Sequence, residues 1–362
     1  MDRRRFIELS ALAGLSASLP HVARAAFAPS PAHGWRTFEV VTRVEPVATD
    51  TDVTVWIPLP SVEQPDWIRV LGNEWGGNAA RAGIAVDPVY GSRMLVAQWL
   101  KGQGVPELEV VSRVSTRDRA LDLSSPGKVA DLDDATRQLY TRATELLPTD
   151  GIVRDTALEA TRGAKTDMER ARALYDWVCD RTERNPKTRG CGLGDIRSML
   201  VSGNLSGKCA DLNALFVGMA RSVGLPARDV YGIRVADSRF GYKSLGKSGD
   251  ISKAQHCRAE VWLTGFGWVP VDPADVRKVV LEEKPGLTLK DDVVVAAREK
   301  LFGAWEMNWL AYNFGHDIAL PGSAGPALPF LMYPQGETAG GRFDSLDPAA
   351  FSYTIKSREI TG

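Results

Sequence analysis

The sequence predicts an α+β protein in which a cysteine-bearing helix packs on an antiparallel sheet, between an N-terminal β-sandwich-like domain and a β-rich C-terminal extension. Three observations favour this class. β-Branched and aromatic runs dominate residues 35–121, apolar residues follow helical spacing from about residue 134, and strand-like aromatic runs return beyond residue 300. We expect a targeting segment (1–25), a β-rich domain (26–130), a core (131–300) and the extension (301–362).

The composition is that of an ordinary globular protein. Of 362 residues, 44% are hydrophobic and 25% are charged, which excludes a disordered, collagen-like or coiled-coil chain. The 44 basic and 45 acidic side chains nearly balance, which argues against a nucleic-acid partner. Only four Cys and four His are available for metal-ligand or imidazole chemistry.

The N-terminus has the pattern of an export signal. Arg3, Arg4 and Arg5 precede a modestly apolar stretch (9–19) that is too short to span a bilayer, and residues 23–25 form a small-x-small cleavage pattern. This resembles a twin-arginine signal, which implies export to the periplasm by the twin-arginine (Tat) machinery. The alternative is a basic N-terminus with a chance apolar run. Without residues 1–25, 40 basic and 43 acidic residues remain, and no membrane span is expected.

The first domain should be built from strands. Residues 38–44 and 53–57 are β-branched and aromatic, and Pro58 ends the second run because it cannot donate to a sheet ladder. Residues 94–100 and 108–114 have the same character. Beyond residue 300, the runs at 330–333 and 351–355 also predict strands.

Helices are predicted over 134–147, 152–161 and 168–184. In the third, Ala171, Leu174, Tyr175 and Val178 follow the spacing of a buried stripe. The glycine-rich loop that follows (189–195) lacks the Lys-Ser/Thr ending of a phosphate-binding loop, so it does not predict nucleotide binding.

A fourth helix is predicted to begin at a cysteine. Apolar residues at 212, 215, 216, 219, 220 and 223 form a helical stripe that Gly224 and Pro226 end, so Cys209 lies at the first turn. The free amides and partial positive charge of a helix N-terminus stabilise a thiolate and can hold an oxyanion. The alternative is a buried, inert thiol.

Histidine and aspartate candidates follow on a predicted hairpin. On a strand over 255–263, His256, Arg258 and Glu260 share one face, while Cys257 points to the other and is unsuited to activation by His256. The return strand (268–271) ends at Asp272, beside the His256 end of the hairpin. A Cys–His–Asp set is what thiol acyl transfer requires.

The other histidines are weaker candidates. His21 leaves with the signal and His33 lies near the terminus, while His316 has no nucleophile motif nearby and is expected to be structural. Glu260 is expected to pair with an arginine.

Several further assignments remain open at this stage. The backbone amide of Cys209 is the natural oxyanion donor, and the Asn204 side chain is either a second donor or a support for the turn. Cys179 and Cys191 could form a disulfide in an oxidising compartment. The loop 241–254 is either a substrate-contacting lid or a solvated connector. Cys209, His256 and Cys257 could ligate zinc but lack its usual spacing, so no metal or other cofactor is expected.

Three ordered motifs resemble the transglutaminase-like superfamily, the papain-like thiol enzymes with Cys, His, Asp order. The resemblance covers about residues 165–275. The first motif is Gly207-x-Cys209-Ala-Asp-Leu-x-Ala-Leu-Phe together with Ala220-Arg221-x-x-Gly224-Leu-Pro226-Ala-Arg228, the second is His256 through Val261, and the third is Gly267-Trp268-Val269-Pro270-Val271-Asp272-Pro273. It implies that Cys209 is the nucleophile, His256 the general base and acid, and Asp272 the orienting carboxylate. Arg258 departs from the pattern, since many members have an aromatic residue there, and this bears on substrate preference.

The resemblance implies a cofactor-free thiol hydrolase or acyltransferase that attacks an amide or peptide bond of a peptide or protein through an acyl-enzyme. A cysteine protease or amidase is favoured. A protein-crosslinking transglutaminase is the alternative within this chemistry, and a non-enzymatic binding or assembly module on the same fold is the alternative outside it.

Overall fold

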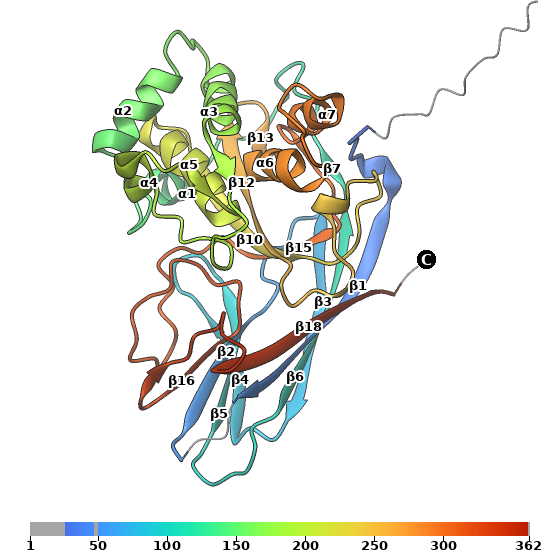
Figure 1. The fold of residues 1–362 in the computed structure, drawn as a ribbon, viewed down its shortest axis with the longest axis vertical. Coiled ribbons are helices and arrows are strands. Elements are labelled where there is room, and N and C mark those ends of the chain that lie inside the picture. The colour runs from blue at the N-terminus through green and yellow to red at the C-terminus, as the bar shows by residue number, and fades with distance from the viewer. Residues whose placement is uncertain (1–25, 47–49, 361–362) are drawn as a thin grey trace, which may run out of the picture.

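The computed structural model describes residues 26–46 and 50–360, so the predicted export signal lies outside the described residues. Helices gather at one end of the molecule and long strands at the other (Figure 1). The α+β class is confirmed. None of the described helices is long and apolar enough to cross a membrane.

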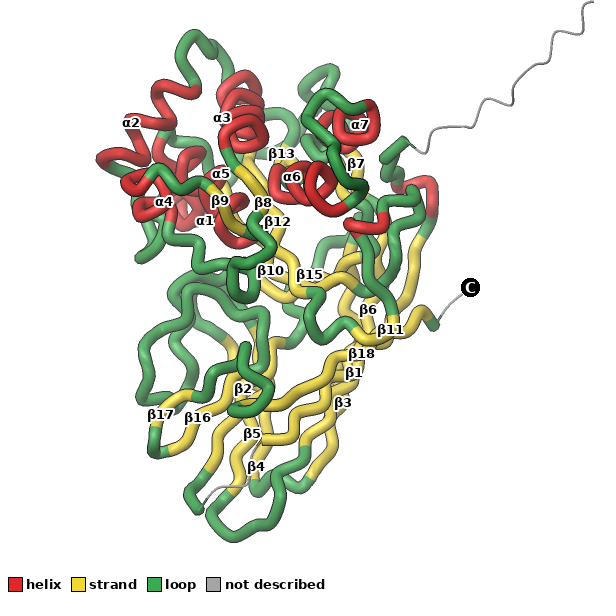
Figure 2. The backbone as a smooth tube through the Cα atoms, viewed as in Figure 1, coloured by secondary structure: helices red, strands yellow, loops and turns green. Residues whose placement is uncertain are grey.

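Two five-stranded antiparallel sheets form the strand-rich end (Figure 2). The first has the order β11-β18-β1-β6-β3, with bounds Gly249–Asp250, Phe351–Glu359, Trp35–Pro46, Leu108–Arg117 and Ile68–Gly77. The second has the order β17-β16-β2-β5-β4, with bounds Gly341–Arg342, Gln335–Thr338, Val53–Pro58, Arg93–Trp99 and Arg81–Val86. Val44 and Val110 from the first sheet pack with Val55 and Leu95 from the second in one buried cluster, so the sheets face each other as in a sandwich.

The last strands of the chain complete both of these sheets. β18 pairs with β1 over nine residues, with Val41 opposite Lys356, and β16 pairs with β2, with Val55 opposite Gly336. Phe351 on β18 lies in the cluster between the sheets. The predicted extension is therefore interleaved with the N-terminal strands.

A third, four-stranded sheet carries the helices. Its order is β13-β12-β10-β15, with bounds Gly267–Val271, Gln255–Leu263, Ala227–Arg234 and Trp309–Asn313. Helix α5 (Cys209–Ser222) packs against β12 and β10, and every residue of α5, β10 and β12 is buried. Both strands also carry charged residues, among them Arg228 on β10 and Glu260 on β12, which are buried as an ion pair.

The other helices pack directly on α5 or, in the case of α7, on α6. They are α1 (Asp134–Thr141), α2 (Gly151–Ala160), α3 (Asp167–Arg181), α4 (Ile196–Ser202), α6 (Pro273–Glu282) and α7 (Asp292–Lys300). The predictions over 152–161 and 168–184 are confirmed to within a few residues. α1 ends earlier than predicted, because the chain turns where Thr144 and Leu147 exchange backbone hydrogen bonds and Leu147 enters the core.

Short elements join these parts. β7 (Arg119–Ala120) pairs with β14 (Ala304–Trp305), and the η1 and η2 turns cover Pro31–His33 and Lys243–Leu245. β8 (Glu183–Arg184) pairs in parallel with β9 (Ser206–Gly207), which holds the chain after α3 beside the residues that lead into α5.

Candidate active site

Cys209 is the first residue of α5 and is 3% exposed. The amides of the first helical turn have no acceptor within the helix, so the Cys209 N–H lies among groups suited to hold a negative oxygen. The predicted placement of Cys209 at a helix N-terminus is confirmed.

Asp211 links the glycine-rich loop to this end of the helix through hydrogen bonds. One carboxylate oxygen accepts the backbone N–H groups of Leu193 and Gly194, both at 3.0 Å, and the other accepts that of Lys208 at 3.0 Å. A Cβ at Gly207 would lie 2.5 Å from this carboxylate. Position 207 is therefore held to glycine by the close approach of Asp211.

Two further thiols lie beside Cys209. Cys191 comes from the glycine-rich loop and Cys257 from β12, and both are buried. Hydrogen bonding with these thiols and then with His256, together with the charge of His256, holds the pKa of Cys209 well below its usual value. The pKa of Cys257 is raised well above its usual value, chiefly because that thiol is buried. Of the two, Cys209 has the thiolate character that a nucleophile needs.

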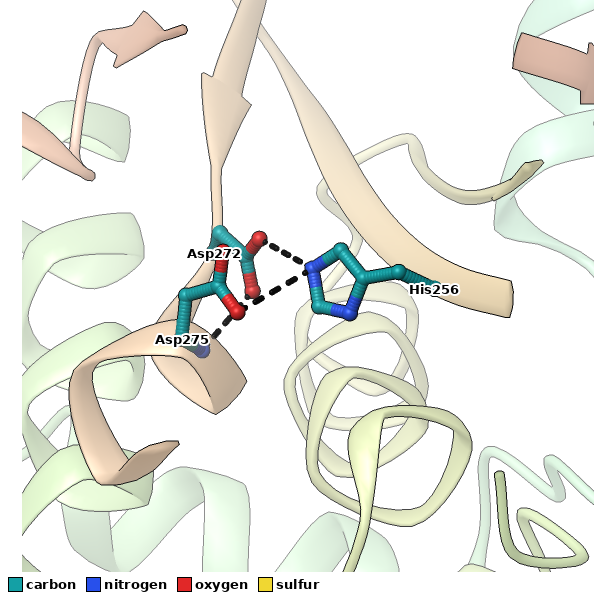
Figure 3. Close-up of side chains that lie close together, drawn as sticks. All are labelled: His256, Asp272 and Asp275. Carbon is teal, nitrogen blue, oxygen red and sulfur yellow. Dashed lines mark hydrogen bonds and ion pairs between the residues drawn. The ribbon is translucent and has the colours of Figure 1, made fainter. Parts of the chain in front are cut away.

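His256 lies near the start of β12 and faces two carboxylates. Its Nε2 lies 2.7 Å from Oδ2 of Asp272 and 3.4 Å from Oδ1 of Asp275 (Figure 3). Asp272 caps helix α6, where its Oδ1 accepts the Asp275 N–H at 3.1 Å. Because the carboxylates hold Nε2, Nδ1 is the ring nitrogen left to exchange a proton with Cys209.

The two carboxylates decide the charge of His256. Burial lowers its pKa, but the negative charges of Asp275 and Asp272 outweigh burial and raise the pKa to about 9. The pKa of Asp275 stays well below its usual value despite burial, because Arg234 and His256 are close, and Arg234 donates to Asp275 at 2.6 Å. His256 is therefore protonated at neutral pH and can pair with the Cys209 thiolate.

Other buried groups fix the His–Asp pair in place. Asn213, one turn along α5 from Cys209, donates from Nδ2 to Asp272 Oδ1 at 3.2 Å and to the Cys257 carbonyl at 2.8 Å. Trp309 donates its indole N–H to the His256 carbonyl at 3.0 Å. These bonds hold α5, β12 and β15 together beside the His256–Asp272 pair.

Arg258 is buried behind this pair. Its Nε lies 3.6 Å from Oδ2 of Asp272, and its guanidinium donates to the Glu306 carbonyl at 2.9 Å. It does not line the cavity described below, so it acts on the orienting carboxylate and not on a substrate.

A cavity of about 700 Å³ opens over the reactive groups. Cys209 and His256 both line it. One wall comes from the loop before β12, including Lys253 and Ala254, and another from the C-terminal segment, including Tyr353. The loop before β12 and the C-terminal segment thus both enclose the thiol.

The remaining candidates lie elsewhere. Asn204 is exposed and does not line the cavity, and its Oδ1 accepts the Ser206 N–H at 3.2 Å, which is the turn-supporting role. Cys179 and Cys191 are both free thiols. Cys191 contacts the group around Cys209, whereas Cys179 lies in α3 beside Tyr175, so the disulfide allowed by the sequence is not formed.

The structure also tests the expectations for His316, Glu260 and the loop 241–254. His316 lies apart, 3.2 Å from Asp229, in a buried pair. Glu260 pairs with Arg228 at 2.6 Å and also with Arg119, as expected. The loop 241–254 does line the cavity, but its strand β11 is paired with β18, so it is a fixed wall.

The carboxylates that could bind a metal at the candidate site already lie beside positively charged side chains. Atoms of His256, Asp272 and Asp275 lie within 4.8 Å of one another, which is compatible with a cation. Arg234 and Arg258 already approach the two carboxylates, however, and their positive charges favour the hydrogen-bonded triad.

Sequence reasoning missed the residues that support the triad. Asp275 follows Asp272 by three positions, and the run Asp272-Pro273 is a helix start that would have placed Asp275 in the first turn beside it. Asn213 had the weaker signal of a polar residue within an apolar stripe. The approach of Cys191 to Cys209 is a long-range contact that no local pattern marks.

Comparisons with known proteins agree with this arrangement. The sequence model of the transglutaminase-like superfamily matches residues 154–273, which include Cys209, His256 and Asp272. An uncharacterized protein of Haemophilus influenzae is 34% identical over 345 residues, covering 91% of this chain and 92% of the relative. The chain belongs to the transglutaminase-like superfamily.

A solved structure shares the fold. A crystal structure described as a "putative cysteine protease" from Cytophaga hutchinsonii superposes with a TM-score of 0.55 and 14% identity, covering 90% of this chain and 98% of the other. The periplasmic domain of TgpA from Pseudomonas aeruginosa aligns with a TM-score of 0.37 and 18% identity, over 70% of this chain and 91% of that one. The α+β papain-like core is confirmed.

Proposed function

We propose that this protein is an exported thiol hydrolase that cleaves an amide or peptide bond through an acyl-enzyme on Cys209. The observation that carries the proposal is the placement of Cys209 at the N-terminus of α5, with a low thiol pKa, beside a protonated His256 that is hydrogen-bonded to Asp272.

The first half-reaction follows from this charge arrangement. The Cys209 thiolate attacks the carbonyl carbon, and the backbone N–H of Cys209 stabilises the negative oxygen that develops. His256 then gives its proton to the leaving nitrogen, the carbon–nitrogen bond breaks, and a thioester remains on Cys209.

The second half-reaction reverses the role of His256. The neutral imidazole takes a proton from water, the resulting hydroxide attacks the thioester, and Cys209 leaves as a thiolate. Asp272 holds Nε2 throughout, which keeps Nδ1 directed at the reacting atoms.

Hydrolysis is proposed over amine transfer because the structural relative from Cytophaga hutchinsonii is described as a "putative cysteine protease". We also propose that residues 131–300 form the catalytic unit and that residues 1–25 direct export to the periplasm through the Tat machinery. Replacing Arg3 and Arg4 by Lys should prevent processing of the precursor, and unchanged processing would refute this route.

The proposed nucleophile can be tested by alkylation. Wild type, Cys209→Ala and Cys257→Ala are treated with iodoacetamide at pH 7, and the modified peptide is identified by mass spectrometry. We expect rapid labelling of Cys209 in wild type and in Cys257→Ala, and none of it in Cys209→Ala. His256→Ala should slow labelling at neutral pH by about tenfold or more, since it removes the imidazolium.

Slow labelling of Cys209 that His256→Ala leaves unchanged would refute the enzyme proposal. That outcome would favour the alternative that the protein is a non-enzymatic binding or assembly module on the same fold.

A further inference from the structure

The cavity over Cys209 is much more basic than the protein as a whole. The full chain carries a net charge of −1. Among the residues that line the cavity, by contrast, seven are Lys or Arg, and Asp250 is the one Asp or Glu. Basic side chains have therefore been concentrated around the thiol.

Part of this charge is neutralised by acids behind the lining. Arg189 pairs with Asp344, and Arg234 pairs with Asp275. Glu282 is shared between two cations, because it pairs with Arg184 and lies 3.7 Å from the amino group of Lys278. These four cations are thus matched by only three carboxylates, which leaves excess positive charge in this part of the lining.

Three lysines of the lining are left without an acidic partner. Lys208 directly precedes Cys209, while Lys247 and Lys253 belong to the loop that leads into His256. Within residues 26–46 and 50–360, none of the three forms a salt bridge. Lys247 interacts with Asp250 only through its charge. The pKa of the Asp250 carboxyl is lowered first by hydrogen bonds from Ser252 and then, to a smaller extent, by the charges of Lys356 and Lys247.

The positions of these lysines are set by the fold. β11 and the residues after it are tied to β18, where Gly249 lies opposite Ser357 and Ile251 donates its N–H to the Ile355 carbonyl at 2.8 Å. Lys247 and Lys253 flank this paired segment, and Lys208 is fixed by α5. The lysines therefore line the cavity from two separate elements.

Part of the cavity lining is apolar. Leu346, Pro348, Phe351 and Tyr353 line the same cavity from the C-terminal segment. A ligand in this cavity therefore meets both positive charge and apolar surface.

We propose that the substrate is an acidic peptide, whose carboxylates lie close to the bond that Cys209 attacks and are recognised by Lys208, Lys247 and Lys253. This specificity rests on the proposed function, because it concerns the substrate of the same thiol. Lysine suits the role because its charge sits on a flexible stem that can reach carboxylates at several positions. Partial enclosure by the cavity strengthens the attraction relative to bulk water.

Two alkylating reagents that differ chiefly in charge test the proposal. Iodoacetate is anionic and iodoacetamide is neutral, and both transfer a two-carbon group to the thiolate with loss of iodide. The measured quantity is the ratio of the two rates at Cys209, for wild type, Lys208→Glu, Lys253→Glu and the double variant. Lys128→Glu is the matched control, since Lys128 is exposed and does not line the cavity.

We expect each cavity substitution to lower the iodoacetate-to-iodoacetamide ratio by about threefold, and the double variant by roughly tenfold, because each reverses one charge near the thiol. The ratio in wild type should fall as salt is added. Lys128→Glu should leave the ratio unchanged. An unchanged ratio in the double variant, with rapid iodoacetamide labelling, would overturn the acidic specificity and leave the proposed thiol chemistry intact.

A second test measures whether a peptide protects Cys209 from alkylation. A peptide of sequence acetyl-Ala-Glu-Ala-Glu-Ala-amide should slow alkylation of wild-type Cys209 by iodoacetamide at concentrations where its Gln counterpart does not. Equal protection by the two peptides would refute the proposal. No labelling of Cys209 by either reagent would instead refute the proposed function itself.

Discussion

At the scale of single residues, the charge on His256 depends on two carboxylates and not on one. Asp272 makes the shorter contact, at 2.7 Å, but Asp275 lies 3.4 Å from the same nitrogen and is itself held by Arg234. The second carboxylate adds its negative charge to that of Asp272 and so stabilises the imidazolium. Asp275 is therefore a positioning and charge-setting residue.

Replacing Asp275 by Asn should lower the pKa of His256 from about 9 by one unit or more, since it removes one of the charges that raise it. NMR titration of the imidazole measures this shift. Asp237→Asn, at an exposed carboxylate elsewhere, is the control. An unchanged His256 pKa in Asp275→Asn would contradict the role.

The same substitution has a consequence for stability. Because the folded pKa of His256 lies above the unfolded value of about 6.5, its contribution is fully present below pH 6.5 and is lost as the pH rises through about 9. In wild type the lowered pKa of the Cys209 thiol has the opposite effect, so the fall is measured in Cys209→Ala, whose free energy of unfolding should decrease across this window. Adding Asp275→Asn to Cys209→Ala should give a smaller fall in urea denaturation measured at pH 6 and pH 9.5.

At the scale of elements, the nucleophile depends on the junction between α5 and the glycine-rich loop. Asp211 joins the two through three backbone hydrogen bonds, and Ala210 donates its N–H to the Cys191 carbonyl at 2.9 Å. The loop thereby forms one side of the cavity at a fixed distance from the thiol.

Asp211→Ala should destabilise the protein by about 2–3 kcal/mol, since it leaves buried amides without acceptors. It should also slow alkylation of Cys209 by iodoacetamide. Asp195→Ala is the matched control, because Asp195 caps α4 from the same loop by accepting the Ser198 N–H. The control should cost about 1 kcal/mol with little change in alkylation. Equal effects of both variants on alkylation would contradict the special role of Asp211.

The elements themselves were largely predictable from sequence. The stripe from residue 212 to 223 predicted α5, and alternation along 255–263 placed His256 and Cys257 on opposite faces. Both signals are local and depend on the burial of one face. Helix α6 was missed because residues 268–273 were interpreted only as a strand and its end, although Pro273 at the first helical position is a start signal.

At the scale of the whole molecule, the C-terminal segment ties the three large sheets together. Ile355 on β18 packs in one cluster with Phe38 from the first sheet and with Ile233 and Leu310 from the helix-bearing sheet. Phe351, also on β18, packs between the two five-stranded sheets. Local patterns predicted strands near these positions, but pairing across three hundred residues leaves no local signal.

The described parts of the chain should consequently unfold as one unit. Ile355→Ala removes a side chain that is 1% exposed and should cost about 3 kcal/mol, while its exposed neighbour Lys356→Ala should cost less than about 0.5 kcal/mol. In calorimetry we expect a single transition that shifts to lower temperature in Ile355→Ala. Two transitions, of which one shifts, would show that the sheets fold separately.

The central claim is that Cys209 is a thiolate paired with the His256 imidazolium. Its most direct test is the pH dependence of alkylation of Cys209 by iodoacetamide, in wild type and in His256→Ala. We predict that the rate in wild type reaches half of its plateau well below pH 8.5, the usual thiol value, and that His256→Ala moves this midpoint upward. A midpoint at the ordinary thiol value, unchanged by His256→Ala, would contradict the account.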